Sequence, residues 1–333
     1  MAIRIGINGF GRIGKLVFRL ASQNPEIEVV HINDKMTIDL MAHLLKYDTV
    51  HGKFNTKINF DENYIYLNNN RILVTSDSTP AEINWNNEVD FVIESSGRFK
   101  TKTELEGHLK SGVKKVILSC PSSDNSMDRT VVLGVNHLDL QLEDRIISNA
   151  SCTTNCVCVM LKVLKDEFGI RRSFMNTVHP FTNNQNLQDG YHSDFRRARA
   201  ALGNIIPTTT SAIKTTKIIF PEMKDSFDGF ATRVPVSDCS YVELTTNLNK
   251  NVSIKDINDA FLYYSENSLK GYLEYCTDPI VSSDITNNYH SAIFDSLCTK
   301  VLLGDMIQII AWYDNESGYS ARIIDLINYI SKL

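Results

Sequence analysis

The stretch 3-IRIGINGFGRIG-14 carries the strongest constraint on the fold, because three glycines follow a run of β-branched residues and open an amphipathic segment. The spacing of Gly9, Gly11 and Gly14 is G-x-G-x-x-G. In this setting the first glycine permits a tight turn, the second lets backbone N–H groups approach a pyrophosphate, and the third lets a helix pack closely on a strand. The pattern predicts a dinucleotide-binding turn, and a glycine-rich turn without a ligand is the alternative.

Asp34 ends the next predicted strand, EVVHIND, twenty residues after Gly14. At this place an acidic side chain accepts hydrogen bonds from the ribose 2′-OH of NAD and repels the 2′-phosphate of NADP. The order of strand, glycines, helix and Asp34 therefore favours NAD binding over a plain turn.

The pattern of predicted elements changes near residue 150. Before it, short β-branched runs alternate with helical pieces, which predicts a parallel sheet covered by helices. The later runs of this kind are DFVIES, KKVILS, TVVLGV and RIISNA. After it come longer strand candidates, SFMNTVHPF, FDGFATRVPV, CSYVELTTNL and KVLLGDMIQIIAWYDN, with helical stretches at 152–166, 211–219, 254–266 and 324–333. We expect an α/β protein with a Rossmann-type domain at 1–150 and an α+β domain at 151–316.

Composition narrows the classes of function. A chain of 333 residues with 43% hydrophobic residues can bury two cores, and it has neither an apolar run of membrane-spanning length nor a secretory signal at MAIRIGINGFG. We expect a cytoplasmic protein without a membrane partner. Seven cysteines, an odd number, suit free thiols better than disulfides. A formal charge of −5 argues against nucleic acid as the main ligand.

Cys152 lies in 148-SNASCTTNCVC-158, between the predicted strand RIISNA and a predicted helix from Thr153 to Asp166. A helix N-terminus stabilises a thiolate, so Cys152 is a candidate nucleophile. It could equally be a buried inert thiol, one half of a redox pair with Cys156, or part of a metal cluster that adds Cys158. The spacing C-x-x-x-C-x-C has no matching second pair of ligands, so we expect no metal. The inert thiol and the redox pair stay open as interpretations.

A nucleophilic cysteine needs a base, and His179 is the best-placed histidine. It closes the predicted strand SFMNTVH and precedes a long polar loop, although a histidine at a strand end is more often structural. Hydroxyl and guanidinium groups follow, and these suit phosphate oxygens, with surface ion pairs as the plain alternative. They are Thr182, Arg196, Arg197, Arg199, the run 208-TTTS-211 and Arg233.

Several blocks, in order along the whole chain, resemble the phosphorylating (type I) glyceraldehyde-3-phosphate dehydrogenases of the bacterial and chloroplast-like type. The blocks are INGFGRIG, the IND ending at Asp34, HLLKYDTVHG, SNASCTTNC, TVH followed by a threonine, RRARAALGNIIPTTT, RVPV and WYDNESGYSARIIDL. The resemblance implies that Cys152 is the nucleophile and His179 its partner. It implies NAD-dependent oxidation and phosphorylation of glyceraldehyde 3-phosphate to 1,3-bisphosphoglycerate through a cysteine thioester, in glycolysis or gluconeogenesis.

The resemblance also implies ligand residues. The substrate's own phosphate would lie on Thr182 and Arg233. The attacking inorganic phosphate would lie among Ser151, Thr153, Arg197, Thr210 and Ser211. Cofactor positions are Arg12, Ile13, Asp34, Ser119 and Asn315, with Asn315 on the nicotinamide amide. The family further implies a homotetramer in which loop 181–205 lies near a neighbouring subunit's cofactor, and a C-terminal helix, 317–333, packed back on the cofactor domain.

The sequence shows four departures from the family pattern. Ser211 replaces a glycine, Asn186 a basic residue, Ser317 a tryptophan, and the pair Gly190–Tyr191 a Leu-Pro pair. Erythrose-4-phosphate dehydrogenase is the alternative enzyme, because it shares HLLKYDT and the D-x-Y-H of 189–192. A redox-sensing or RNA-binding protein that reuses the thiols and the dinucleotide fold is a rival of another class, and the acidic charge balance counts against RNA.

Overall fold

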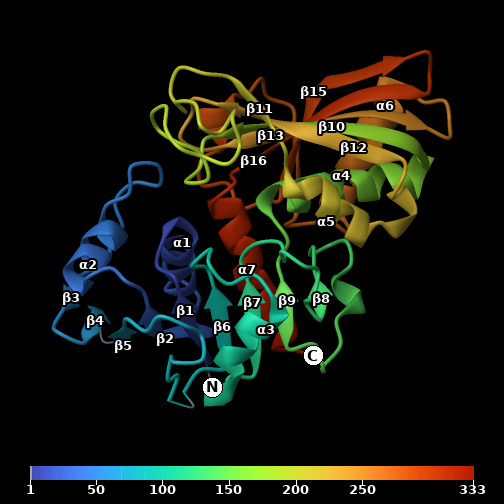
Figure 1. Ribbon diagram of the computed structural model, residues 1–333. Coiled ribbons are helices and arrows are strands. Elements are labelled where there is room, and N and C mark those ends of the chain that lie inside the picture. The colour runs from blue at the N-terminus through green and yellow to red at the C-terminus, as the bar shows by residue number, and fades with distance from the viewer. Residues whose placement is uncertain (1, 69, 87) are drawn as a thin grey trace. The chain divides into compact units, whose positions relative to one another are not determined.

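The computed structural model describes residues 2–68, 70–86 and 88–333 (Figure 1). Contacts within the chain divide it into two compact units. The first unit comprises the residues up to Val131, Leu138–Ala150 and Ser320–Leu333, and the second comprises Val132–His137 and Ser151–Tyr319. Each unit has its own sheet, and each is described by itself.

The sheet of the first unit has the strand order β3-β4-β5-β2-β1-β6-β7-β9-β8 in the described part of the chain. Strands β5, β2, β1, β6, β7, β9 and β8 run parallel, while β3 and β4 add an antiparallel edge. The central strands are buried and rich in isoleucine and valine, as parallel strands covered on both faces require. Their bounds are β1 Ile3–Asn8, β2 Ile27–Asn33, β3 Ile58–Phe60, β4 Tyr64–Leu67, β5 Asn70–Thr75, β6 Phe91–Glu94, β7 Lys115–Leu118, β8 Arg129–Thr130 and β9 Ile146–Ser148.

The helices of the first unit follow the expected alternation with the strands. Helix α1 buries Leu16, Val17 and Ala21 on one face and begins directly after the glycine-rich turn. The helical segments are α1 Arg12–Ala21, α2 Ile38–Lys46, α3 Lys102–Leu105 with the 3-10 turn η1 Glu106–Ser111, and α7 Ser317–Ile330. Helix α7 belongs to this unit from Ser320 onward. The 3-10 turn η2 His137–Asp139 lies where the chain passes from one unit to the other. The predicted βαβ opening and the α/β fold class are confirmed.

The sequence pattern is wrong for TVVLGV, which it predicts as a strand. Only Arg129–Thr130 pairs with the sheet, and the chain then enters the second unit at Val132. There the backbone N–H of Val132 donates to the Asn136 side chain at 2.8 Å, and that of Gly134 donates to His137 Nδ1 at 3.1 Å. Side chains that take up backbone donors in a turn remove them from a strand ladder.

The second unit contains a mixed sheet of order β11-β12-β10-β13-β16-β15-β14. Strands β10 and β12 are parallel, and β10, β13, β16 and β15 form successive antiparallel pairs. The bounds are β10 Ile170–Pro180, β11 Ile206–Thr208, β12 Phe227–Val234, β13 Ser240–Leu248, β14 Leu273–Cys276, β15 Ala292–Leu302 and β16 Met306–Tyr313. The run 300–315, predicted as one strand, is a hairpin that turns at Leu303 and Gly304, both at positive φ (51° and 84°).

Helices α4, α5 and α6 belong to the second unit and match the predicted helical stretches closely (Figure 1). Their bounds are α4 Cys152–Phe168, α5 Ser211–Ile219 and α6 Ile254–Glu266, and two 3-10 turns, η3 Pro221–Met223 and η4 Ser282–Ile285, complete the set. Most of α4 is buried, and it packs on β13, β15 and β16. Among the described residues, no helix has both the length and the apolar character that crossing a bilayer demands.

His31 on β2 leads to a prediction about acid stability. Its ring is buried edge-on against Trp85, with centroids 4.7 Å apart, and burial lowers its pKa from 6.5 to about 4. Between these values the unfolded chain binds a proton that the folded chain does not, so stability present at neutral pH is lost as the pH falls. The loss approaches ~1.4 kcal/mol per pH unit. We expect the free energy of unfolding, measured with urea at pH 7, 6 and 5, to fall less steeply with falling pH for His31→Asn than for the wild type. An equal fall in both proteins would show that His31 does not cause the loss.

Candidate active site

Cys152 is the first residue of α4, at the strand-to-helix junction predicted from the sequence. Ser151 is the N-cap, and its hydroxyl oxygen accepts a hydrogen bond from the backbone N–H of Thr154 at 3.0 Å. Ala150 holds a positive φ of 56°, which L-residues adopt at a cost, so the chain bends sharply just before the cap. The thiol therefore lies at the N-terminal end of a helix of 17 residues.

His179 lies beside the thiol. Its Nε2 is 3.6 Å from Cys152 Sγ, and its side chain is buried near the end of β10. Strand β12 pairs with β10 in a register that places Arg233 directly opposite His179. The Arg233 guanidinium contacts His179 Nδ1 and also donates to the Pro180 carbonyl oxygen at 2.8 Å. The three side chains, 152, 179 and 233, form one connected group.

Arg233 decides which ring nitrogen of His179 carries the hydrogen. A guanidinium donates only, so Nδ1 accepts from it, although Pro180 O also lies 2.9 Å from Nδ1. A hydrogen on Nδ1 would face the guanidinium hydrogens of Arg233. In this arrangement the hydrogen is on Nε2, and it points at the sulfur of Cys152.

Burial keeps the pair uncharged in this arrangement. It raises the pKa of the Cys152 thiol to about 11, against the opposing effects of the Thr153 backbone N–H and the Arg233 charge. Burial and the nearby Arg233 charge lower the pKa of His179 to about 3. Burial thus opposes the stabilisation of the thiolate that the helix N-terminus predicts.

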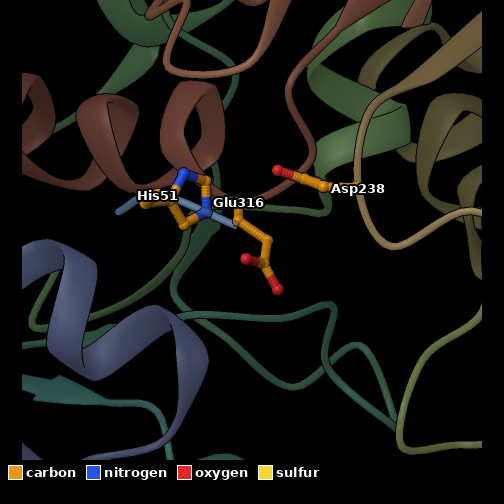
Figure 2. Close-up of side chains that lie close together, drawn as sticks. All are labelled: His51, Asp238 and Glu316. Carbon is orange, nitrogen blue, oxygen red and sulfur yellow. The ribbon is translucent and has the colours of Figure 1, made fainter. Parts of the chain in front are cut away.

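Two carboxylates of the second unit, Asp238 and Glu316, act on the pair through their charge; both are drawn in Figure 2. Asp238 raises the pKa of Cys152, and Glu316 raises that of His179. Asp238 also lies within 4.8 Å of ligand atoms of Cys239 and Asp314, all three residues being buried. Burial and these two charges raise the pKa of the Cys239 thiol, so Cys239 is a neutral thiol. His51, in the same view, belongs to the first unit.

A chain of buried hydroxyls runs from the start of α4 into the sheet. Thr153 Oγ1 lies 2.8 Å from the Tyr313 hydroxyl, which lies 2.9 Å from Thr177 Oγ1, and Thr177 donates to the Tyr241 carbonyl oxygen at 3.1 Å. Each hydroxyl has one hydrogen. Because Thr177 gives its hydrogen to a carbonyl, Tyr313 must donate to Thr177, and Thr153 must donate to Tyr313. Thr153 Oγ1 therefore turns lone pairs, not its hydrogen, towards Cys152 Sγ, 4.0 Å away.

This hydrogen order predicts different effects of two substitutions. Tyr313→Phe removes the acceptor of the Thr153 hydrogen, which frees that hydrogen for the sulfur anion and lowers the thiol pKa. Thr153→Val removes a hydroxyl that gives the sulfur no hydrogen in the wild type. Iodoacetamide should alkylate Cys152 at neutral pH about two- to fivefold faster in the first variant, and within about twofold of the wild-type rate in the second. If both variants slowed the alkylation of Cys152 alike, the connected hydroxyls would contribute only to packing.

The residues expected around inorganic phosphate divide between two places. Ser151 and Thr153 lie with Cys152 at the start of α4. Arg197 lies instead against β11, donating to Thr208 Oγ1 at 2.8 Å and to the Thr209 carbonyl oxygen at 3.0 Å. Thr210 caps α5, its hydroxyl oxygen accepting from the Ala212 N–H at 3.2 Å, and Ser211, exposed, is the first residue of that helix. Arg197 is near enough to Arg233 for its charge to lower the pKa of that guanidinium, after the larger effect of burial.

Thr182 and the departures near it lie in the loop after β10. The Thr182 hydroxyl oxygen accepts from the Asn184 N–H at 3.4 Å and is half-buried. Asn186 donates to the Tyr191 carbonyl oxygen at 3.2 Å, while the Tyr191 side chain is 97% exposed. The neutral Asn186 therefore ties this loop to itself, at a position where the resemblance leads us to expect a basic residue.

The first unit contains a pocket of about 230 Å³ at the ends of its central strands. Gly9 has a φ of 95°, and a Cβ there would lie 2.3 Å from Ser96 N, while a Cβ at Gly14 would lie 2.1 Å from Gly9 O. A Cβ at Gly11 would meet no atom within 4 Å, so its turn faces open space. The pocket is lined by Asn8, Gly9, Gly11, Asn33, Asp34, Lys35, Met36, Asp77, Ser78, Ser95, Ser96, Arg98 and Phe99.

Backbone groups fix the side chain of Asp34. Its two carboxylate oxygens accept from the N–H of Phe10 at 2.6 Å and of Met36 at 2.8 Å. Arg12 and Ile13 open α1, and Arg12 pairs with Asp48. Burial opposes the Asp48 charge, but the Arg12 hydrogen bond and backbone donors hold the pKa of that carboxyl well below its usual range.

The remaining expected cofactor residues lie at strand ends in different units. Ser119 directly follows β7, and its N–H donates to Glu94 O at 2.9 Å in the first unit. Asn315 is a buried residue of the second unit, and its side-chain oxygen accepts from the Ser240 hydroxyl at 2.9 Å.

Sequence reasoning missed Tyr313 and Thr177. The signal for Tyr313 was present, because β16 alternates in burial and its buried positions are Ile307, Ile309, Ala311 and Tyr313. A tyrosine that closes a buried strand face must find a partner for its hydroxyl. Which partner it finds depends on strands far away in the sequence.

Comparison with known proteins places the chain in a family. Residues 3–102 match the profile of the glyceraldehyde 3-phosphate dehydrogenase NAD binding domain, and residues 151–315 match that of the C-terminal domain. Glyceraldehyde-3-phosphate dehydrogenase 1 of Bacillus subtilis is 47% identical over 335 residues, covering 100% of this chain and 99% of that protein. The dehydrogenases of Geobacillus stearothermophilus and Streptomyces coelicolor are 45% and 46% identical, each with 99% of both chains covered. The chain belongs to the glyceraldehyde 3-phosphate dehydrogenase family.

Proposed function

We propose that this protein is an NAD-dependent phosphorylating glyceraldehyde-3-phosphate dehydrogenase that makes 1,3-bisphosphoglycerate through a thioester on Cys152. The observation that carries the proposal is the contact of Cys152 Sγ with His179 Nε2 at 3.6 Å, at the start of a helix, in a chain of this family. A thiol at a helix N-terminus beside an imidazole is the arrangement that covalent catalysis by cysteine needs.

The pocket of the first unit suits the cofactor. Gly11 leaves open space at the N-terminus of α1, where a pyrophosphate would meet backbone N–H groups, and Arg12 and Ile13 begin that helix. The Asp34 carboxylate, held by two backbone donors, would accept from the adenosine ribose hydroxyls. Ser119 and Asn315 complete the proposed set, Asn315 for the nicotinamide amide. When bound, NAD supplies the acceptor for the substrate's hydride.

The position of Arg233 determines whether His179 Nε2 can act as a base. In the proposed mechanism Arg233 turns to the substrate's phosphate together with Thr182, and His179 Nδ1 then donates to Pro180 O, 2.9 Å away. This leaves Nε2 free to accept the proton of Cys152. The sulfur bonds to the aldehyde carbon, and the carbonyl oxygen takes that proton from Nε2 to become the hemithioacetal hydroxyl.

Oxidation and phosphorolysis follow on the same residues. As the hydride leaves the hemithioacetal carbon, His179 takes back the hydroxyl proton, and a thioester forms. An oxygen of inorganic phosphate attacks that carbon, the carbon–sulfur bond breaks, and Cys152 departs as a thiol with the proton of His179. Ser151, Thr153, Arg197, Thr210 and Ser211 are the proposed phosphate ligands, with arginine offering the bidentate fork.

We also propose an oligomeric state and a cellular compartment for this protein. The loop 181–205 leaves Tyr191, Phe195 and Ile205 exposed, which supports burial against another subunit in a homotetramer. The seven cysteines are all free thiols, which supports a reducing compartment, the cytoplasm. Erythrose 4-phosphate as the substrate gains no support from the relatives, which are named glyceraldehyde-3-phosphate dehydrogenases.

A matrix of initial rates tests the proposal. Glyceraldehyde 3-phosphate and erythrose 4-phosphate are each combined with NAD or NADP while inorganic phosphate is titrated. We expect the fastest reduction with glyceraldehyde 3-phosphate and NAD, and a rate that rises with phosphate and saturates. Like charges at the distance of Asp34 from a 2′-phosphate cost on the order of 1 kcal/mol, so NADP should be at least about fivefold poorer in kcat/KM. Faster turnover of the four-carbon sugar, or indifference to phosphate, would refute the assignment.

A further inference from the structure

Three neighbouring strands of the first unit end in polar residues that lie on one rung of the sheet. Asn33 ends β2, Asn8 ends β1 and Glu94 ends β6, and the register pairs Asn8 with both others. Each is at most 3% exposed. Asn33 Nδ2 donates to Asn8 Oδ1 at 2.9 Å, and Asn8 Nδ2 donates to Glu94 Oε2 at 2.6 Å. The side chains thus form a directed row across three strands.

Both ends of this row are closed by further donors. Asn33 Oδ1 accepts from the Thr75 hydroxyl and from the Asp77 N–H, each at 2.8 Å. Glu94 Oε1 accepts from the backbone N–H of Ser96 at 2.9 Å and from the Ser96 hydroxyl. The amide of Asn33 cannot flip without facing donor to donor, and the same holds for Asn8.

His108 and Trp85 fix the charge of Glu94. Both residues are fully buried, and the Trp85 indole N–H, which only donates, lies 3.3 Å from His108 Nδ1. Nδ1 therefore accepts, and His108 is neutral with its hydrogen on Nε2, which donates to Glu94 Oε2 at 3.1 Å. Four neutral donors now converge on Glu94, from Asn8, His108 and the backbone and hydroxyl of Ser96, and an ionised carboxylate can accept from all four. Glu94 is accordingly a buried carboxylate.

The row borders the pocket of the first unit. Asn8 and Asn33 line that pocket themselves, and the residues that follow the three strand ends, Gly9, Asp34, Ser95 and Ser96, line it too. The backbone continues the connection, since Gly9 N–H donates to Asn33 O and Ser95 N–H donates to Asn8 O, each at 2.8 Å. Ser95 Oγ donates to Gly9 O at 2.7 Å. A shift of the row would carry the glycine turn and Asp34 with it.

We infer that Glu94 is a positioning residue of the cofactor pocket, whose buried carboxylate orders Asn8 and Asn33 and so holds the Gly9 turn and Asp34 in place for the dinucleotide. The identity of the ligand rests on the proposed function, whereas the row itself does not. Glu94 does not line the pocket, so its effect passes through its neighbours.

An amide at position 94 breaks the donor order, because its NH2 group would face either Asn8 and His108 or the two donors of Ser96. We therefore expect Glu94→Gln to weaken NAD binding by about tenfold or more, although it conserves shape. Asn8→Asp in the same protein moves the carboxylate one place along the row, where the new amide at position 94 and Asn33 can both donate to it. The double variant should recover part of the lost affinity. Glu62→Gln removes an exposed charge from the same unit and serves as the control.

His108 provides a second pair of variants should Glu94→Gln fold poorly. His108→Gln keeps one donor for Glu94 and one acceptor for Trp85, so it should bind NAD like the wild type. His108→Leu removes the donor, and it should bind several-fold more weakly although His108 does not line the pocket.

The measurement is the Kd for NAD, by calorimetry without substrate, together with kcat and KM and the iodoacetamide alkylation rate of Cys152. We expect Kd and KM for NAD to rise while kcat at saturating NAD and Cys152 alkylation stay near the wild-type values. A Glu94→Gln protein that binds NAD as tightly as Glu62→Gln overturns the inference, and so does a double variant without recovery. Absence of NAD binding by the wild type would instead refute the proposed function.

Discussion

Replacing Cys152 with alanine should lower phosphate-dependent NADH formation by at least about four orders of magnitude, because no other group can carry the thioester. The thiol lies at the start of α4, in contact with His179, and alanine removes only the sulfur. The Kd for NAD should change by less than about twofold, since the proposed adenosine and pyrophosphate ligands lie in the first unit. Stopped assays with saturating aldehyde and phosphate, and calorimetry with NAD, provide the two readouts.

Cys156→Ala is the matched control for this variant. Cys156 lies one turn further along α4, fully buried, with its sulfur 3.8 Å from the Ala311 carbonyl oxygen. Burial raises the pKa of this thiol well above its usual value, so it remains a neutral packing group. Its loss should cost stability and leave most of the rate. If Cys152→Ala kept a substantial rate, or if Cys156→Ala lost as much, the assignment of the nucleophile would be wrong.

The second large effect is expected for His179→Asn. Asparagine can hold a hydrogen bond near Cys152 but cannot accept a proton at neutral pH, so every proton transfer of the proposed mechanism loses its carrier. We expect kcat to fall by about 10² to 10⁴ while KM for NAD changes little. Alkylation of Cys152 by iodoacetamide at pH 7 should also slow, because the Nε2 hydrogen that faces the sulfur is lost.

Arg233→Leu separates the two roles proposed around His179. It removes the charge that, after burial, holds the pKa of His179 down, so the ring should become a better base. It also removes the proposed ligand of the substrate's phosphate. The same charge lowers the pKa of the Cys152 thiol, so its loss changes the alkylation rate in two opposing ways. The proposed phosphate role predicts that the leucine variant requires far more aldehyde, and an unchanged KM for the aldehyde would contradict that role. An unchanged kcat in His179→Asn would contradict the role of His179 as the proton carrier.

Local sequence determined several elements of this protein. The turn at Gly9 requires a positive φ, and the approach of α1 to that turn leaves no room for a Cβ at Gly14. Both positions therefore need glycine, and the spacing of the two glycines predicts the turn and the helix after it. Helices α5 and α6 occupy the predicted ranges 211–219 and 254–266, because their caps Thr210 and Ser253 are local hydroxyls that bond to the first turn. Cys152 begins α4 for the same kind of reason, with Ser151 as cap.

Where the pattern was ambiguous, turns decided the outcome. The apolar run 300–315 fits one long strand or two, and the positive φ of Leu303 together with Gly304 makes it a hairpin. The run TVVLGV has the composition of a strand, yet Asn136 and His137 take its backbone donors. The composition of a segment indicates its preference for strand or turn. Whether it forms a strand also depends on the hydrogen-bond partners of its backbone groups, and residues outside the segment supply those partners.

Tertiary structure alone decided the chemistry of the site. The sequence named Cys152 and His179, but only the register of β10 with β12 brings Arg233 onto Nδ1 and sets the hydrogen on Nε2. Thr153 meets Tyr313 across 160 positions, and Asn8 meets Glu94 across 86. The helix N-terminus visible in the sequence favours a thiolate, yet burial in the folded unit raises the thiol pKa to about 11. Solvent exclusion depends on every chain segment packed around the sulfur, and no local pattern contains that information.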